Sequence, residues 1–371
     1  MKIAIYAICL NERKFVDRFM QSCKEADVVV IADTGSTDGT DDLFRKHGAQ
    51  VHSIKVTPWR FDDARNAALA LVPQDIDICL SLDVDEIPAP GWRQAIENCW
   101  MPETTRGRYR SVYSHLSDGS PGVEFLNTRI HSRHGYRWRH ACHEGLYPDR
   151  TTEHYVLIDG LRIDHWPDSS KSRSSYLGLL QTAAAEEPNE PRMAHYLARE
   201  YYYYGRYAEA IAEFQRYLAF NGSFLPERVA SLIYIGKCVA AQNGNALPWY
   251  HRAIAELPTI REPWIALAEA CYLIQDWPGC YAAAVKGLSI PLQPDGYMSD
   301  PHCYGATPDD LAALGAWNLG MKQAAVIHAR AALQYAPEDE RLRKNLAFME
   351  SESLSEAPPV TRRHKAGRAP K

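Results

Sequence analysis

Residues 76–88, IDICLSLDVDEIP, form a short apolar run that ends in a cluster of acidic side chains. The apolar part is typical of a buried strand. Asp83, Asp85 and Glu86 follow it directly. Alternation along an extended chain would place Asp83 and Asp85 on the same side, where two carboxylates are costly unless a divalent cation lies between them. The stretch therefore predicts a site for Mg²⁺ or Mn²⁺, with Asp85 as a metal ligand.

A short acidic motif is common by chance, so its position in the fold carries the argument. Upstream of it, strand and helix patterns alternate: apolar strands are predicted at 2–10, 28–32, 51–54 and 76–82, and amphipathic helices at 12–24 and 38–47. This alternation predicts an α/β domain with a parallel sheet and helices on both faces. Ligands of such sheets bind at the carboxyl ends of the strands, where this chain concentrates its polar residues.

Two polar motifs follow the first two predicted strands. Asn11 and Glu12 are placed to hold a base or a ribose, although Asn11 is equally suited to cap a helix. In ADTGSTDGT, residues 32–40, Asp33 can accept a hydrogen bond from a nucleobase or a ribose hydroxyl, and the same residues can form a turn that caps the next helix. Neither the GxGxxG spacing nor the Gly-Lys-Ser/Thr of a phosphate loop occurs here.

A third motif, FDDARNAAL at 61–69, contains Arg65 on helical spacing. A helix at this position can direct Arg65 to the carboxyl edge of the sheet, where a guanidinium would bind a diphosphate through two hydrogen bonds. The alternative is an ion pair between Arg65 and an aspartate of the same domain.

The second half of the chain is helical and repetitive. Small and aromatic residues recur, and the first two sets are about 34 to 36 residues apart, which is typical of tetratricopeptide repeats. The recurring positions are Ala210, Phe214 and Pro226, then Ala246, Tyr250, Ala253 and Pro258, then Ala325, Ala329, Ala332 and Pro337. About four degenerate repeats fit, one of them interrupted by an insert at 291–306. A generic alanine-rich helical bundle is the alternative.

Length and composition limit the class of protein. A chain of 371 residues favours two domains, and a net charge of -5 argues against general nucleic-acid binding. Nine scattered cysteines without a CxxC pair indicate reduced thiols. The first apolar run is too short for a signal peptide, and no run reaches the roughly 18 apolar residues of a membrane span. We therefore expect a cytoplasmic protein with no membrane span.

The motifs taken together resemble a known family. MKIAIYAICLNERKFVDRFM, ADTGSTDGT, FDDARNAAL and SLDVDEIP, in this order over about the first 100 residues, look like inverting glycosyltransferase family 2 with the GT-A fold. The variant with C-terminal tetratricopeptide-like repeats, similar to peptide S-glycosyltransferases, matches the second half. The resemblance implies a GT-A domain with a Rossmann-like mixed sheet at 1–172 and helical repeats at 173–350. The loss of periodicity and the basic residues at 351–371 predict a disordered tail.

For the site, the resemblance implies a UDP-sugar donor. Asp33 would bind the uridine, Arg65 the diphosphate, and Asp83 with Asp85 the ribose and the metal. Many relatives have two consecutive acids in the turn motif, whereas Thr34 follows Asp33 here. The nucleotide is therefore less certain than the class of donor.

Downstream, a His-Glu pair and a second histidine attract attention. Relatives carry a similar His-Glu pair, which makes Glu144 the candidate base and Asp118 the reserve. Either His143 or His165 would complete the metal site, or both are structural histidines in an aromatic neighbourhood. An inverting transfer needs one carboxylate to take the proton of the acceptor as its oxygen or sulfur attacks the sugar.

The acceptor is open at this stage. A repeat domain favours a peptide or protein, and it can equally serve to form a homodimer. A glycan, a lipid-linked acceptor and modified DNA are alternatives, the last suggested by the basic tail and the stretch 129–140. A non-catalytic scaffold with a degenerate transferase domain is the alternative from another class. A nucleotidyltransferase is disfavoured because the glycine-rich, arginine-containing loop after the first strand is missing.

Overall fold

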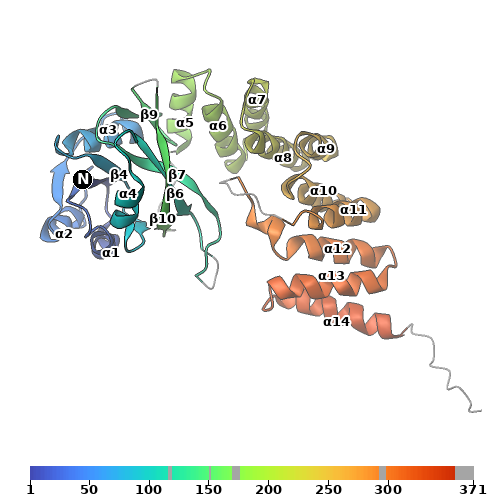
Figure 1. The fold of residues 1–371 in the computed structure, drawn as a ribbon. Helices are drawn as coiled ribbons and strands as arrows, with labels where there is room; N and C mark the ends of the chain where they lie inside the picture. The colour runs from blue at the N-terminus through green and yellow to red at the C-terminus, as the bar shows by residue number, and fades with distance from the viewer. Residues whose placement is uncertain (116–118, 150–151, 169–175, 292–297, 356–371) are drawn as a thin grey trace, which may run out of the picture. The chain divides into compact units, whose positions relative to one another are not determined.

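The computed structural model describes residues 1–371 except 116–118, 150–151, 169–175, 292–297 and 356–371. Its N-terminal part contains an eight-stranded sheet in the order β3-β2-β1-β4-β7-β6-β10-β5 (Figure 1). The first four of these are parallel to one another: β1 (Ile3–Cys9), β2 (Val28–Asp33), β3 (Gln50–Ser53) and β4 (Ile78–Ser81). The strands expected from the sequence are thus confirmed to within two residues at each end.

The other half of the sheet is mixed. It contains β5 (Glu86–Pro88), β6 (Arg106–Val112), β7 (Glu124–Ser132) and β10 (Tyr155–His165). β7 is antiparallel to both β4 and β6, β6 and β10 are parallel, and β5 is antiparallel to β10. A separate hairpin is formed by β8 (Tyr136–Arg139) and β9 (Gly145–Pro148). The expected mixed α/β fold is confirmed.

Helices cover both faces of the sheet because side chains alternate along β1. Ile3 and Ile5 belong to a core that includes Phe19. This core is covered by α1 (Val16–Ser22), α2 (Thr40–Lys46) and α4 (Trp92–Cys99). The short helix η1 (Arg13–Phe15) directly precedes α1. Ala4 and Tyr6 face the opposite core, which contains Leu69 of α3 (Phe61–Leu71) and Trp138 of the hairpin. Figure 1 shows α3 on one side of the sheet and α1 and α2 on the other.

The rest of the described chain is helical. Further helices follow α5 (Tyr176–Glu186), and consecutive helices within one compact unit pack against each other. They are α6 (Pro191–Tyr203), α7 (Tyr207–Ala219), α8 (Leu225–Ala241), α9 (Leu247–Glu256), α10 (Glu262–Leu273), α11 (Trp277–Leu288), α12 (Thr307–Asn318), α13 (Lys322–Tyr335) and α14 (Glu340–Ser355). This helical array, like the α/β sheet before it, agrees with the fold class expected from the sequence.

The small and aromatic residues that define the repeat lie at the contacts between helices. Ala210 and Phe214 are buried in α7, Tyr250 and Ala253 in α9, and Ala329 in α13. The helix α11 has the same character, with Cys280, Ala283 and Ala284 buried, although the sequence pattern did not single it out. The expected insert at 291–306 falls between α11 and α12; within its described part lies η2 (Pro301–Tyr304).

The described chain packs as two compact units, β1 through α8 and α9 through α14, and each is treated separately below. The first unit thus combines the sheet with the first four helices of the array. All nine cysteines are free thiols. Among the described residues, no helix combines the length and the apolar character needed to cross a bilayer.

Candidate active site

The loops after β1 and β2 are joined to each other at the carboxyl edge of the sheet. The Asn11 amide donates to Ser36 Oγ at 2.9 Å, and Asn11 Oδ1 accepts from the Thr37 amide at 2.8 Å. The Glu12 amide donates to Thr40 Oγ1 at 2.8 Å, and the Glu12 side chain is buried. Asn11 and Glu12 therefore fix the geometry of this edge, and their contact with a donor stays a prediction.

The Asp33 side chain stabilises the turn that follows β2. Its Oδ2 accepts from the Gly35 and Ser36 amides, both at 3.1 Å, and the residue is only 3% exposed. The backbone of Gly35 has φ of 115°, a conformation that L side chains rarely adopt, so glycine suits this turn. The turn anticipated for the motif is present, but the N-cap of α2 is Gly39, so no side chain of the motif caps that helix from the N-cap position. A role in binding the nucleotide stays a prediction.

The acidic stretch after β4 is a turn and not an extended chain. β4 ends at Ser81, and the Glu86 amide donates to the Asp83 carbonyl at 2.9 Å. The expectation that Asp83 and Asp85 share one side through strand alternation is therefore wrong. Glu86 Oε2 accepts a hydrogen bond from the Asp83 amide at 2.8 Å, so the Glu86 side chain also stabilises the turn.

Asp83 is embedded in a network of ion pairs. Its Oδ1 accepts from Arg65 Nη2 at 2.6 Å and its Oδ2 from Arg129 Nη1 at 2.9 Å. Burial alone would raise the pKa of Asp83, but the facing Arg65 and Arg129 outweigh it and hold this pKa well below the usual range. Arg129 also contacts Glu86 Oε2 at 3.2 Å. Burial is the main reason why the pKa of Glu86 is nevertheless raised.

Arg65 is the centre of this network. Besides Asp83, its Nε donates to Glu144 Oε1 at 2.5 Å, and its guanidinium lies 4.9 Å from the centre of the Trp138 ring. The Arg65 side chain is 4% exposed. The alternative that the sequence left open, an ion pair of Arg65 with an aspartate of its own domain, is thus present. Contact of Arg65 with a diphosphate stays a prediction.

Asp85 contacts the end of β10. Its Oδ2 lies 3.4 Å from His165 Nε2, and its carbonyl accepts from the Trp166 amide at 2.9 Å. The antiparallel pairing of β5 with β10, in which His165 is the partner of Glu86, brings the two together. His165 Nδ1 lies 3.1 Å from the Tyr113 carbonyl, which favours a proton on Nδ1 and a lone pair on Nε2.

The residues present fit a divalent cation. A carboxylate oxygen and an imidazole nitrogen facing each other are a donor pair that suits Mn²⁺, and Asp85 and His165 are both only about one fifth exposed at their side chains. His143, the other candidate, instead stacks on Tyr196 of α6 with ring centres 3.9 Å apart. Asp118, the reserve base, lies outside the described residues.

Some residues of the site escaped the sequence analysis. Arg129 was not singled out, although it is the second guanidinium on Asp83. The Tyr109 hydroxyl is buried beside this network and has no hydrogen-bond partner among the described residues. His115 stacks on Trp166 with ring centres 3.7 Å apart and contacts Asp164 at 3.1 Å. The position of Arg129 directly before the buried Ile130 in β7 is a signal that could have pointed to it, because a largely buried arginine needs partners.

Comparison with known proteins gives one sequence family and one kind of fold. Residues 5–97 match the family described as Glycosyl transferase family 2. No curated protein matches the chain.

Solved structures similar to the chain include TTC0263, a thermophilic TPR protein of Thermus thermophilus, at 17% identity and TM-score 0.35, over 48% of this chain and 90% of that one. Yeast Tom70 is similar at 15% identity and TM-score 0.38, over 50% of this chain and 37% of that one. YrrB, described as a TPR protein with an unusual peptide-binding site, is similar at 14% identity and TM-score 0.35, over 48% and 83%.

Proposed function

We propose that the chain moves a sugar from a UDP-sugar to a hydroxyl or thiol of a peptide or protein, with inversion at the anomeric carbon. The match of residues 5–97 to glycosyl transferase family 2 supports glycosyl transfer from a nucleotide-sugar donor. The observation that carries the finer proposal is the pairing of Asp85 with His165 beside the network of Arg65, Asp83 and Glu144. Both lie at the carboxyl edge of the sheet, where parallel strands present their ligand sites.

The donor site in this proposal uses the carboxyl ends of β1, β2 and β4. Asp33 contacts the uracil or the ribose, and Asp83 contacts the ribose. Asp85 and His165 would hold Mn²⁺ or Mg²⁺. Such an ion, when bound, neutralises the diphosphate and stabilises it as the leaving group. The Arg65 guanidinium is paired with Asp83, and its positive charge lowers the pKa of that carboxylate.

Glu144 is the proposed base. Its Oε1 accepts from Arg65 Nε, which fixes the carboxylate in one orientation, and its side chain is 9% exposed. The second oxygen would take the proton of the acceptor as the acceptor attacks the sugar from the side opposite the diphosphate. The bond from the anomeric carbon to the acceptor forms while the bond to the diphosphate oxygen breaks, so no covalent enzyme intermediate is needed.

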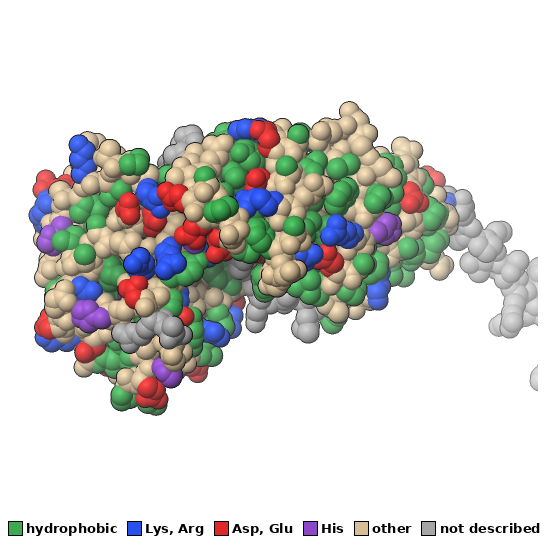
Figure 2. Space-filling view, turned by 90° about the horizontal axis from the view of Figure 1, so that it is seen from above, with side chains coloured by type: hydrophobic (Ala, Val, Ile, Leu, Met, Phe, Trp, Pro, Cys, Tyr) green, Lys and Arg blue, Asp and Glu red, His purple; other side chains and the backbone are tan. Residues whose placement is uncertain are grey.

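The helical array and the surface charge support a peptide or protein as the acceptor. Packed helix pairs of this kind provide extended surfaces suited to a peptide or protein. On the face seen in Figure 2, basic side chains alternate with acidic ones, which supports such an acceptor over nucleic acid.

The test is calorimetric binding of UDP with and without Mn²⁺, followed by hydrolysis of a panel of UDP-sugars. We expect UDP to bind more tightly with Mn²⁺ and Asp85→Asn to lower turnover by about 10²- to 10³-fold, because the loss of several kcal/mol of charge stabilisation has this effect. The matched control is Asp75→Asn, which removes an exposed aspartate paired with Lys2. If the affinity for UDP is the same with and without Mn²⁺, and Asp85→Asn keeps full activity, the non-catalytic scaffold is the better description.

A second variant tests the base. Glu144→Gln keeps an oxygen that can accept from Arg65 and removes the ability to take a proton. We expect transfer to fall by about 10²- to 10⁴-fold while UDP binding is retained, since general bases contribute in this range. Retained transfer by a folded Glu144→Gln protein would assign the base to another group.

A further inference from the structure

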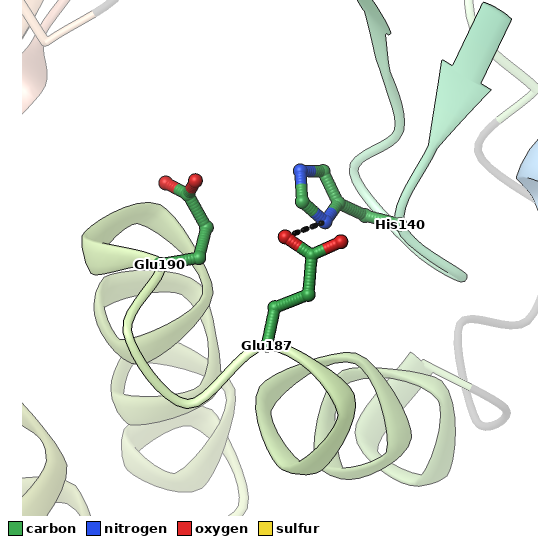
Figure 3. Close-up of side chains that lie close together, drawn as sticks. All are labelled: His140, Glu187 and Glu190. Atoms are coloured by element: carbon green, nitrogen blue, oxygen red, sulfur yellow. Dashed lines mark ion pairs between the residues drawn. The ribbon is translucent and has the colours of Figure 1, made fainter.

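Away from the sheet edge, three side chains of the first unit converge at the corner between α5 and α6 (Figure 3). His140 directly follows β8, whereas Glu187 and Glu190 belong to the link between α5 and α6. One ring nitrogen of His140 and one oxygen of each carboxylate all lie within 4.8 Å of one another. We call these three residues the corner cluster.

The two nitrogens of His140 have different surroundings. Nε2 lies 2.9 Å from the Tyr147 hydroxyl, whereas Nδ1 is buried and has no hydrogen-bond partner among the described residues. The nearest carboxylate oxygen, Glu187 Oε2, is 3.7 Å from Nδ1, which is too far for a hydrogen bond. A buried polar atom of this kind requires an explanation, since such atoms are nearly always satisfied in folded proteins.

Burial favours the neutral form of the His140 ring. Burial is the largest influence and lowers the pKa of His140, although Glu187 and Glu190 act in the opposite direction. His140 is 3% exposed. A neutral ring with its proton on Nε2, directed at Tyr147, keeps the lone pair on Nδ1, the nitrogen that lies 3.7 Å from Glu187 Oε2.

The carboxylates outnumber the cations around this nitrogen. Glu190 Oε1 caps α6 by accepting from the Arg192 amide at 3.2 Å, so its second oxygen can serve as a ligand. Asp62 adds further negative charge near His140, and Arg192 adds positive charge. Arg60, the neighbouring arginine, is paired with Asp62 and Glu186 and not with the corner cluster.

We propose that His140, Glu187 and Glu190 bind a divalent transition-metal ion, with Zn²⁺ as the best match. One imidazole nitrogen and two carboxylate oxygens are ligands that Zn²⁺ accepts, and water completes its coordination. The Tyr147 hydroxyl acts on the far nitrogen of His140, as groups outside the ligand shell commonly do for a ligating histidine. This site is separate from the pair of Asp85 and His165.

A bound ion would fasten the segment 140–144 to the helices. The Ala141 carbonyl accepts from the Phe61 amide at 3.0 Å, at the start of the helix that carries Arg65. Ala141 and Cys142 are buried in a core with Leu180 and Met193 of α5 and α6. The ion would add a third attachment to the segment that ends at Glu144, the partner of Arg65.

The experiment uses the full chain with Asp85→Asn, so that an ion at the sheet edge is not counted. Zn²⁺ alone is titrated by calorimetry, and bound zinc is counted after desalting. We expect one bound Zn²⁺ per chain. Glu187→Gln and Glu190→Gln remove a ligand, and each should weaken binding by at least tenfold. Tyr147→Phe should weaken binding by roughly 10-fold, as loss of a group outside the ligand shell does.

The matched control is Glu186→Gln, which removes the same charge from the adjacent residue but from outside the corner cluster. It should leave Zn²⁺ binding unchanged. Circular dichroism establishes that each variant is folded, and the readout does not depend on glycosyl transfer. The proposal is overturned if the folded chain binds no Zn²⁺, if both ligand variants bind it as the parent does, or if Glu186→Gln loses it equally.

Discussion

At the end of β4, Asp83 and Glu86 face the guanidinium groups of Arg65 and Arg129, whereas at the corner between α5 and α6 Glu187 and Glu190 face an imidazole. Both groups contain two carboxylates in the same compact unit. In the first, permanent positive charges are built into the fold. In the second, the facing group is an imidazole, whose neutral form is favoured by burial.

This difference predicts opposite responses to substitution. The first group contributes to stability before any ligand arrives, because its charges are buried and paired. The second contributes little until a cation binds. The predictions below test this contrast, beginning with the largest effect.

Arg65→Met should have the largest effect on stability. It leaves Asp83 and Glu144 without their shared partner in a buried setting, and breaking such pairs costs about 3–5 kcal/mol. Urea unfolding measures this change. Arg137→Met, which breaks an exposed pair with Asp149, should cost only about 0–1 kcal/mol. Equal losses in both variants would contradict the view that burial makes the first group different.

Acid should lower the stability of the protein through the core histidine His131, which is hydrogen-bonded on both nitrogens, unlike His140 in the described part of the chain. His131 is satisfied on both nitrogens, by the Tyr6 hydroxyl at 3.0 Å and the Ser132 carbonyl at 2.8 Å, and burial lowers its pKa to about 3. The unfolded chain therefore takes up a proton at this residue near pH 6.5 while the folded chain does not. Stability is full above that pH and falls as the pH drops toward 3, by up to about 1.4 kcal/mol per pH unit.

His131→Gln should reduce the slope between pH 6.5 and 4.5 but not abolish it, because burial also lowers the pKa of His195 to about 3. The substitution lowers stability at pH 7. The measurement is urea unfolding at a series of pH values. A slope identical to that of the parent would show that other groups cause the acid sensitivity.

Tyr109→Phe should change stability little, despite complete burial. Its hydroxyl has no hydrogen-bond partner among the described residues, so removing it relieves a buried polar group and should stabilise by about 0–1 kcal/mol. Tyr6→Phe is the control, because the Tyr6 hydroxyl is bonded to His131 and accepts from Trp138 Nε1 at 2.9 Å. Destabilisation of Tyr109→Phe as large as that of Tyr6→Phe would mean that the Tyr109 hydroxyl has a partner in solution.

Glu187→Gln without metal should have the smallest effect. The Glu187 side chain is 42% exposed and lies beyond hydrogen-bond distance of His140, so its loss should stay within about 0.5 kcal/mol, as at most surface positions. Thermal unfolding in a chelator measures this. A loss comparable to that of Arg65→Met would contradict the contrast between the two groups.

Much of the fold could be predicted because the signals for it are local. The apolar runs ending near Cys9, Asp33 and Ser81 became the parallel strands, and the small residues such as Ala210 and Ala329 became helix contacts. The turn after Ser81 could not be predicted from alternation, because the hydrogen bond from Glu86 to Asp83 replaces the extended conformation.

The sequence by itself determined the order of the polar motifs along the strands, the helical array and the residue types at the sheet edge, since hydrophobic period and motif order are properties of neighbouring residues. Tertiary structure alone decided the partners: Arg65 with Asp83 and Glu144, Asp85 with His165, and His140 with the two glutamates. These residues are far apart along the chain. Which charges face each other depends on how strands and helices pack, and no local pattern records that.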